Sequence, residues 1–145
     1  MSDIIVTSCR YHLGDNPSVF QDGVYIGYNL TLPLAVTWLD DQATVVALHF
    51  ETRELETWGA WKGHPVHLNG HEIGRLKDAG NQNGRIETIR IAVPMAQFRR
   101  WSEQSGGNLQ LSILLEKQPS HPSLSDDFML TRISAIGAVM RLGTK

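Results

Sequence analysis

Apolar side chains alternate with polar ones in several short segments, and this period of two constrains the fold more than any other feature of the sequence. The alternation is clearest in residues 24–32 and 109–116, and it recurs in residues 44–51 and 86–93. A period of two places the apolar side chains on one face of an extended strand, whereas a helix needs spacings of three and four. The sequence therefore predicts a protein built mainly from half-buried strands.

Turn-forming residues separate these segments, because the chain contains 13 glycines and 6 prolines. The dipeptide Asn69-Gly70 readily adopts the positive φ values of a tight turn, which predicts a hairpin over residues 66–76. In residues 128–140 the apolar positions slip by one residue, which indicates a bulge in the last strand. Regularly spaced short strands and turns favour a sandwich or a barrel.

One segment departs from the alternation. Apolar side chains recur at Met95, Phe98 and Trp101, and this spacing of three is typical of a helix. Pro94 suits the start of such a helix, and Gly106-Gly107 would end it. We expect one short helix here, with Trp101 in the core.

Together these elements predict a single domain that spans residues 1–145. The fold class is all-β, an antiparallel β-sandwich of about eight strands with one short helix. The single cysteine, Cys9, cannot form an internal disulfide, so packing must stabilise the fold.

Charge and hydropathy narrow the range of partners. The chain has 13 Lys and Arg against 15 Asp and Glu, a net charge of -2, and lacks the basic cluster that nucleic acid or an anionic membrane would require. No window approaches the roughly 18 apolar residues of a membrane span, and the N-terminus does not resemble a signal peptide. We therefore expect a cytoplasmic protein, or one exported by a signal-independent route, with no nucleic-acid or membrane partner.

Between Thr44 and Ala138, a buried strand at residues 44–51 and four later segments follow one another in a recognisable order. After the buried strand come the hairpin Pro65–Leu76, a strand that ends in Val93-Pro94, the segment Gly107–Leu111 and the segment Asp126–Leu130. This ordered set resembles the galactose-binding-domain-like jelly rolls, which occur as carbohydrate-binding modules and as accessory domains of glycan-degrading enzymes. The resemblance implies a jelly-roll fold and a non-catalytic binding module for a carbohydrate or a carbohydrate-like ligand.

Two tryptophans are the first candidates for contacts with such a ligand. Trp58 and Trp61 lie in a glycine-containing loop just before the Asn-Gly hairpin, and loop aromatics can stack on sugar rings. We predict a ligand-binding surface formed by both tryptophans with His64, His67 and Asn69. In the alternative, one or both tryptophans fold back and cap the end of the sandwich.

The resemblance also implies a structural calcium ion. Many members bind it with oxygen atoms early in the chain and with a carboxylate at the start of the last strand. Asp126 and Asp127 match the second position, and Asp15 and Asp22 are candidates for the first because they lie in an early loop. Oxygen donors suit calcium, so Asp126 and Asp127 are the predicted metal ligands.

Two further classes of function stay open. The protein could be a structural or interaction subunit of a larger assembly, such as a phage particle, a secretion apparatus or its cargo. It could also be a metal-dependent hydrolase that uses His64, His67 and His71, with Glu72 acting on a metal-bound water. Asn69-Gly70 interrupts that histidine cluster, and no nucleophile or phosphate-binding motif is present, so we expect no enzyme.

Self-association is the last expectation. If Tyr25, Val45 and Ala47 all face outward, they leave apolar surface that a monomer would normally cover. A twofold homodimer is the commonest way to cover it. The alternative is cover from within the chain, by residues 4–9 or 34–39.

Overall fold

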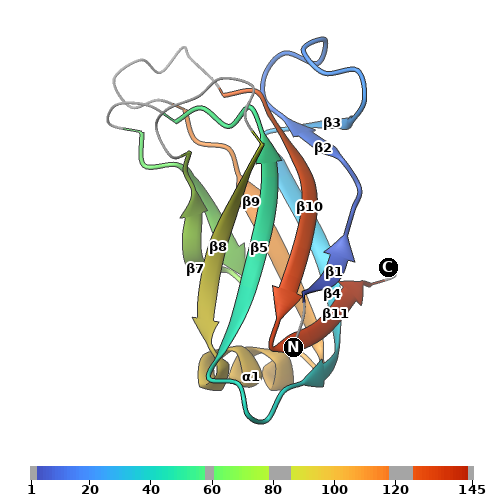
Figure 1. The fold of residues 1–145 in the computed structure, drawn as a ribbon, viewed down its shortest axis with the longest axis vertical. Helices are drawn as coiled ribbons and strands as arrows, with labels where there is room; N and C mark the ends of the chain where they lie inside the picture. Colours follow the sequence, from blue (N-terminus) through green and yellow to red (C-terminus); the bar gives the residue numbers. More distant parts are fainter. Residues whose placement is uncertain (1–2, 58–60, 79–85, 118–125, 144–145) are drawn as a thin grey trace.

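A computed structural model of the chain describes residues 3–57, 61–78, 86–117 and 126–143. These residues form eleven strands and one helix (Figure 1). The elements are β1 (Ile4–Thr7), β2 (Tyr11–Leu13), β3 (Val24–Gly27), β4 (Asn29–Leu39), β5 (Val45–Arg53), β6 (His64–Leu68), β7 (His71–Leu76), β8 (Ile86–Pro94), α1 (Met95–Gln104), β9 (Asn108–Leu114), β10 (Phe128–Ile136) and β11 (Ala138–Leu142).

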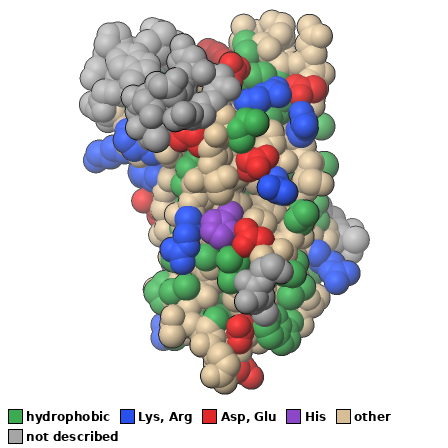
Figure 2. Space-filling view, in the orientation of Figure 1, with side chains coloured by type: hydrophobic (Ala, Val, Ile, Leu, Met, Phe, Trp, Pro, Cys, Tyr) green, Lys and Arg blue, Asp and Glu red, His purple; other side chains and the backbone are tan. Residues whose placement is uncertain are grey.

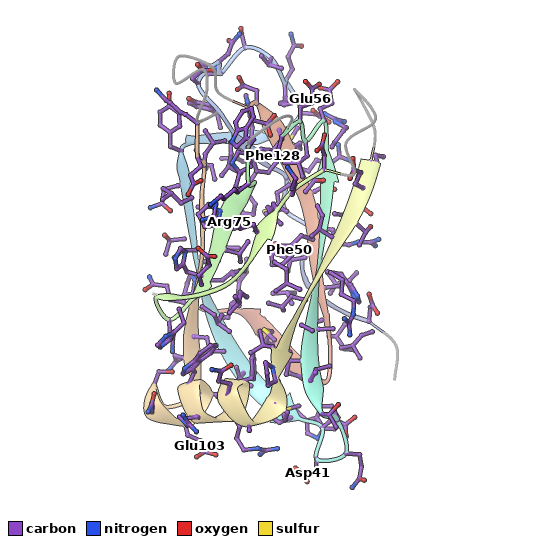
Figure 3. The ribbon with its side chains drawn as sticks, turned by 90° about the vertical axis from the view of Figure 1, so that its left-hand side faces the viewer. Asp41, Phe50, Glu56, Arg75, Glu103 and Phe128 are labelled. Carbon is purple, nitrogen blue, oxygen red and sulfur yellow. The ribbon has the colours of Figure 1, made fainter. Side chains whose placement is uncertain are left out.

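The strands form two sheets that pack face to face. Sheet A has the order β3-β2-β10-β5-β8, with β1 also paired to β10, and sheet B has the order β11-β4-β9-β6-β7. Neighbouring strands are antiparallel except β2 and β3, which are parallel. The turned view of Figure 3 shows the two layers with side chains between them. The prediction of a mostly β, sandwich-like protein with one helix is confirmed at this level.

The alternation seen in the sequence produces the core. Val46, Leu48 and Phe50 on β5 are fully buried and belong to the same cluster as Leu111 and Ile113 on β9. Phe50 lies between the two layers in Figure 3. Burying a side chain of this size stabilises a fold by roughly 1.5 to 3 kcal/mol. Strand alternation therefore supplies the main stabilising contacts between the sheets.

Two segments that the sequence presents as single strands pass from one sheet to the other. In residues 24–32 the chain leaves sheet A after β3 and enters sheet B as β4, and Gly27 at the change has φ 80°. Gly137, with φ 95°, stands at the second change, between β10 in sheet A and β11 in sheet B. These two corners account for two of the strands that the structure has beyond the roughly eight that the sequence indicates, and the short strand β2 is a further one.

The hairpin and the bulge lie where the sequence predicts them. Asn69 and Gly70 have φ values of 50° and 83° and join β6 to β7 as a two-residue turn. The register between β10 and β5 shifts between Leu130 and Arg132, which is the predicted slip.

The predicted helix is also present. α1 begins directly after Pro94 and closes the lower end of the sandwich in Figure 1. Met95, Phe98, Trp101 and Ser102 form its buried side. Within the described residues, no helix combines the length and apolar character needed to cross a membrane.

The three residues expected to form an apolar outer surface differ in exposure. Tyr25 is 39% exposed and its hydroxyl donates to the carbonyl of Gly14, at 2.7 Å. Val45 is half-buried, and Ala47 is only 2% exposed. Ala47 therefore adds almost no surface to a dimer contact, and Tyr25 is the most exposed of these three residues.

Candidate functional site

A hollow lies between the edge strands of the two sheets. It measures about 490 Å³ and is lined by residues 70–73 of the hairpin and β7, residues 92–94 of β8, and Gln97 and Trp101 of α1. In Figure 3, β7 and β8 run in front of the core and diverge toward α1. Its size is within the range of small-molecule sites in proteins. We call this region the α1 hollow.

A pair of stacked rings forms one wall of the α1 hollow. The imidazole of His71 lies parallel to the indole of Trp101, with ring centroids 4.6 Å apart and an angle of 3° between the rings. Trp101 is buried on the inner side of α1, whereas His71, at the start of β7, is exposed. Because the tight Asn69-Gly70 turn sets the start of β7, it also places His71 against the helix.

Two polar side chains complete the lining. Glu72 on β7 is exposed and forms an ion pair with Arg75 at 3.3 Å. Gln97 is exposed and lies one helical turn before Trp101, so both side chains occupy the same face of α1. The α1 hollow thus combines an aromatic wall with groups that form hydrogen bonds, which is typical of sites for polar ring-shaped ligands.

The predicted binding residues of the hairpin have other positions. Asn69 donates from Nδ2 to Ser105 Oγ at 3.3 Å, and its Oδ1 accepts the backbone N–H of Gln110 at 2.8 Å. It therefore fastens the turn to β9 and to the end of α1. His67 is half-buried and pairs in register with Ser112 and Glu72. His67 neighbours the α1 hollow through Glu72 but does not line it.

Trp61 and His64 are buried, so the expected exposed loop surface is not formed by them. Trp61 is 2% exposed, and its Nε1–H donates to the carbonyl of Glu116 at 2.8 Å. This is the alternative placement, in which the ring caps the end of the sandwich. Partners for both the ring and the N–H inside the fold explain the burial. Trp58 lies outside the described residues.

His64 is held by three partners in the core. Its Nδ1 accepts the backbone N–H of Glu116 at 3.1 Å, so the proton of the neutral ring is on Nε2, which donates to Asp126 Oδ2 at 3.0 Å. The ring also stacks on Phe128 at 5.1 Å. Burial lowers the pKa of His64 to about 4 and raises the pKa of Asp126 to about 8. Desolvation therefore favours the uncharged form of both groups.

Asp127 belongs to a second, separate histidine pair. His12 Nε2 and Asp127 Oδ1 are 2.8 Å apart, and the same oxygen accepts the backbone N–H of Asn16 at 3.1 Å. His12 is fully buried, and its Nδ1 has no hydrogen-bond partner among the described residues. A hydrogen bond with the Asp127 carboxyl raises the pKa of Asp15. Asp15 and Asp127 therefore lie against each other.

The candidate metal ligands do not gather in one place. Within the described part of the chain, no three or more His, Cys, Asp or Glu residues are arranged to hold a metal ion. All three histidines are on sheet B, but His64 is buried against Asp126, His67 pairs in register with Ser112 and His71 stacks on Trp101. Asp126 is committed to His64 and to the backbone N–H of Glu56, at 3.2 Å. Of the predicted pair, only Asp127 has a second carboxylate beside it.

A smaller hollow of about 130 Å³ lies on the outer face of sheet A. There Asp3 Oδ2 accepts from Ser134 Oγ at 3.1 Å and is 2.9 Å from His49 Nδ1, while Arg132 pairs with Glu51 at 3.2 Å. Figure 2 shows acidic and basic side chains interspersed around a histidine on this face. These groups satisfy one another, which indicates a structural network.

Sequence reasoning did not identify the α1 hollow. The sequence predicts that Trp101 is in the core, which is correct for most of its ring, and it offers His71 only as a candidate metal ligand. The four-residue spacing of Gln97 and Trp101 was the available signal. The missing information was the packing of β7 and β8 beside α1.

Scans of this chain against models of protein families, against curated proteins and against solved structures each return no match.

Proposed function

We propose that this protein is a non-catalytic binding module for a carbohydrate or a carbohydrate-like ligand, and that the ligand binds in the α1 hollow. The observation that carries the proposal is the combination of a hollow of about 490 Å³ with the stacked pair His71 and Trp101. A sugar ring offers C–H groups on its face and hydroxyls on its edge. The aromatic wall suits the first, and Glu72 and Gln97 suit the second.

The finer fold that goes with this proposal is a galactose-binding-domain-like jelly roll. Its support is the order of elements in the two facing sheets. The buried strand β5 precedes the Asn-Gly hairpin of β6 and β7, β8 ends at Pro94, and β9 is followed by two carboxylates at the start of β10. This is the same order on which the sequence resemblance rests.

The His64–Asp126 pair and the His12–Asp127 pair both support a binding role over a catalytic one. His64 uses both ring nitrogens inside the fold, so neither is free to exchange a proton with a substrate. His12 is fully buried between Phe20 and Tyr25, whose rings meet it edge-on. Both pairs join separate segments of the chain to the start of β10.

We extend the proposal to a structural calcium ion between Asp127 and Asp15, because Asp126 is already bonded to His64 and to the Glu56 N–H. Two adjacent carboxylates repel each other, and a cation between them would remove that cost. Asp22, the other early candidate, is engaged by Arg10 at 2.6 Å and Arg53 at 2.9 Å. Asp15 and Asp127 would supply the charged oxygens of the site, and the ion would tie the early loop to β10.

A protein-interaction role is the second candidate function. Apolar side chains are exposed beside the edge strand β11, where Ile5, Trp38 and Leu142 are 55%, 42% and 37% exposed. β1 and β11 lie against each other, and Trp38 pairs with Val139 on β11. Exposed apolar groups beside a sheet edge are typical of surfaces that meet another protein.

A pair of glutamine variants on one helix tests the proposed site. Gln97→Ala removes a polar group from the lining, whereas Gln104→Ala changes another exposed glutamine of α1 that does not line the hollow. We expect Gln97→Ala to weaken binding of the oligosaccharides recognised in an array by about fivefold to tenfold, the loss of one hydrogen bond, and Gln104→Ala to leave it unchanged. Equal affinities of both variants would contradict the proposed site.

A further inference from the structure

We propose that the α1 hollow selects a sugar unit that carries a free, protonated amino group, and that Glu72 is the residue that recognises it. This inference rests on the proposed function and specifies its ligand class. It is argued from the charges that line the hollow and from the partners of those charges.

Among the described residues, the lining of the α1 hollow carries one carboxylate and no lysine or arginine. Glu72 is the acidic residue among the described residues that form the walls, and the remaining lining residues are apolar, amide or imidazole side chains, or glycine. Arg100 is on the same helix as Gln97 and Trp101 but does not contribute to the lining. A ligand that enters the hollow therefore meets an acidic group without a matching basic group on the walls.

Arg75, which forms an ion pair with Glu72, also bonds to other partners. Arg75 Nη1 donates to Glu116 Oε1 at 2.9 Å and to the carbonyl of Gly63 at 3.1 Å, while its contact with Glu72 is longer, at 3.3 Å. The Glu72 side chain is 46% exposed, and ion pairs with this much solvent contribute little. Glu72 can therefore accept an ammonium group without losing a strong internal partner.

The aromatic wall supports the same ligand class. A protonated amino group beside an aromatic ring gains attraction from the ring electrons, in addition to its attraction to a carboxylate. The stacked rings of His71 and Trp101 and the Glu72 residue all belong to the lining of the α1 hollow. A sugar with a carboxylate group would instead place a like charge against Glu72, which costs binding energy.

Matched oligosaccharides separate these possibilities. Glucosamine hexamers, N-acetylglucosamine hexamers and galacturonic acid hexamers carry positive, neutral and negative units, and calorimetry at about pH 6 keeps the amine protonated. We expect the protein to bind the glucosamine hexamer about tenfold more tightly than the N-acetylglucosamine hexamer, with the galacturonic acid hexamer weakest.

Two variants that each remove one negative charge test whether Glu72 causes the preference for the glucosamine hexamer. Glu72→Gln should bring the affinity ratio of the first two hexamers close to one, whereas Glu103→Gln should preserve it, because Glu103 points away from the sandwich on α1 (Figure 3). A ratio near one in the unaltered protein, or a ratio that survives Glu72→Gln, overturns the proposal.

The outcomes also separate this inference from the proposed function. If the neutral hexamer binds in the α1 hollow as tightly as the charged one, the binding module stands and the preference for an amino group is refuted. If no sugar binds but a lysine-rich peptide binds with the same dependence on Glu72, both the sugar ligand and the proposed function are refuted.

Discussion

At the scale of single residues, two consecutive aspartates serve different parts of the fold. Asp126 points to His64 of sheet B, and Asp127 points to His12 of sheet A. The sequence predicts this divergence, because neighbouring side chains in an extended segment point to opposite sides. As a result, the Asp126 carboxyl is buried and desolvated, whereas the Asp127 carboxyl contacts solvent and the carboxyl of Asp15.

The buried carboxyl gives the protein a defined dependence on pH. Burial raises the pKa of Asp126 from 3.8 to about 8, so the folded state keeps a proton that the unfolded state has lost, and stability falls as pH rises through this range. The lowered pKa of His64 makes stability rise with pH, but only between its pKa of about 4 and its ordinary value of 6.5. We therefore expect the free energy of unfolding to drop by about 1 to 2 kcal/mol between pH 6.5 and 8.

The adjacent aspartate provides the control. In urea titrations at both pH values, Asp126→Asn should abolish most of the drop, since the amide oxygen still accepts from His64 and from the Glu56 N–H. Asp127→Asn should retain it. Stability that is flat over this range in the unaltered protein, or a drop that persists in Asp126→Asn, would refute the account of Asp126.

The sequence predicts a residue's position correctly where the local pattern determines it, but not where partners far along the chain determine it. The turn at Asn69-Gly70 follows from local backbone preferences. Trp61 could not be placed, because its burial depends on the carbonyl of Glu116, far along the chain. The burial of His64 could not be predicted for the same reason, since its partners Asp126 and Phe128 lie far along the chain, at the start of a strand in the opposite sheet.

At the scale of elements, two glycines decide how strands are divided between the sheets. The alternation of apolar and polar residues predicts the strands themselves. It continues through the corners at Gly27 and Gly137, so at each corner the sequence pattern shows one strand where the structure has two. Gly27 and Gly137 both have positive φ, yet their surroundings differ. A Cβ at Gly27 would meet open space, whereas a Cβ at Gly137 would lie 2.6 Å from the carbonyl oxygen of Val45.

This difference predicts unequal costs for the same substitution. Gly27→Ala should destabilise the protein by about 1 kcal/mol, the cost of a positive φ for a residue with a side chain. Gly137→Ala should cost at least about 3 kcal/mol, because the Val45 backbone must also move. Urea unfolding of the two variants measures both values. Equal losses would show that the second corner does not depend on the close approach to β5.

The proposed calcium site lies between the loop before β3 and the start of β10. If the ion binds between Asp15 and Asp127, millimolar calcium should raise the melting temperature and a chelator should lower it, because a ligand of the native state stabilises by mass action. Asp15→Asn should remove the response. Asp22→Asn should keep it, since Asp22 is paired with Arg10 and Arg53. An unchanged melting temperature in calcium would remove the ion from the account.

At the scale of the whole molecule, the proposed site exists only because three distant elements meet. The α1 hollow takes residues from β7 of sheet B, from β8 of sheet A and from the helix that closes the end of the sandwich. The sequence predicts each of these elements, but periodicity contains no information on which strand edges lie next to the helix. For this reason the fold class could be predicted and the hollow could not.

Self-association is also a property of the whole molecule. Exposed Tyr25 on the edge strand β3 is consistent with the expected homodimer, which predicts a mass in light scattering of about twice the 16.2 kDa chain. A mass near 16.2 kDa at micromolar concentration would contradict the homodimer. It would direct attention to a different protein as the partner for the apolar surface beside β11.

The central claim is that a sugar ligand occupies the α1 hollow. It is tested most directly by backbone NMR spectra recorded while an oligosaccharide that binds is titrated into the protein. The account predicts that the largest shift changes fall on residues 70–73 and 92–94 and on Gln97 and Trp101, which come from three separate elements. Shift changes confined to the outer face of sheet A, or to the chain around Trp61, would contradict it.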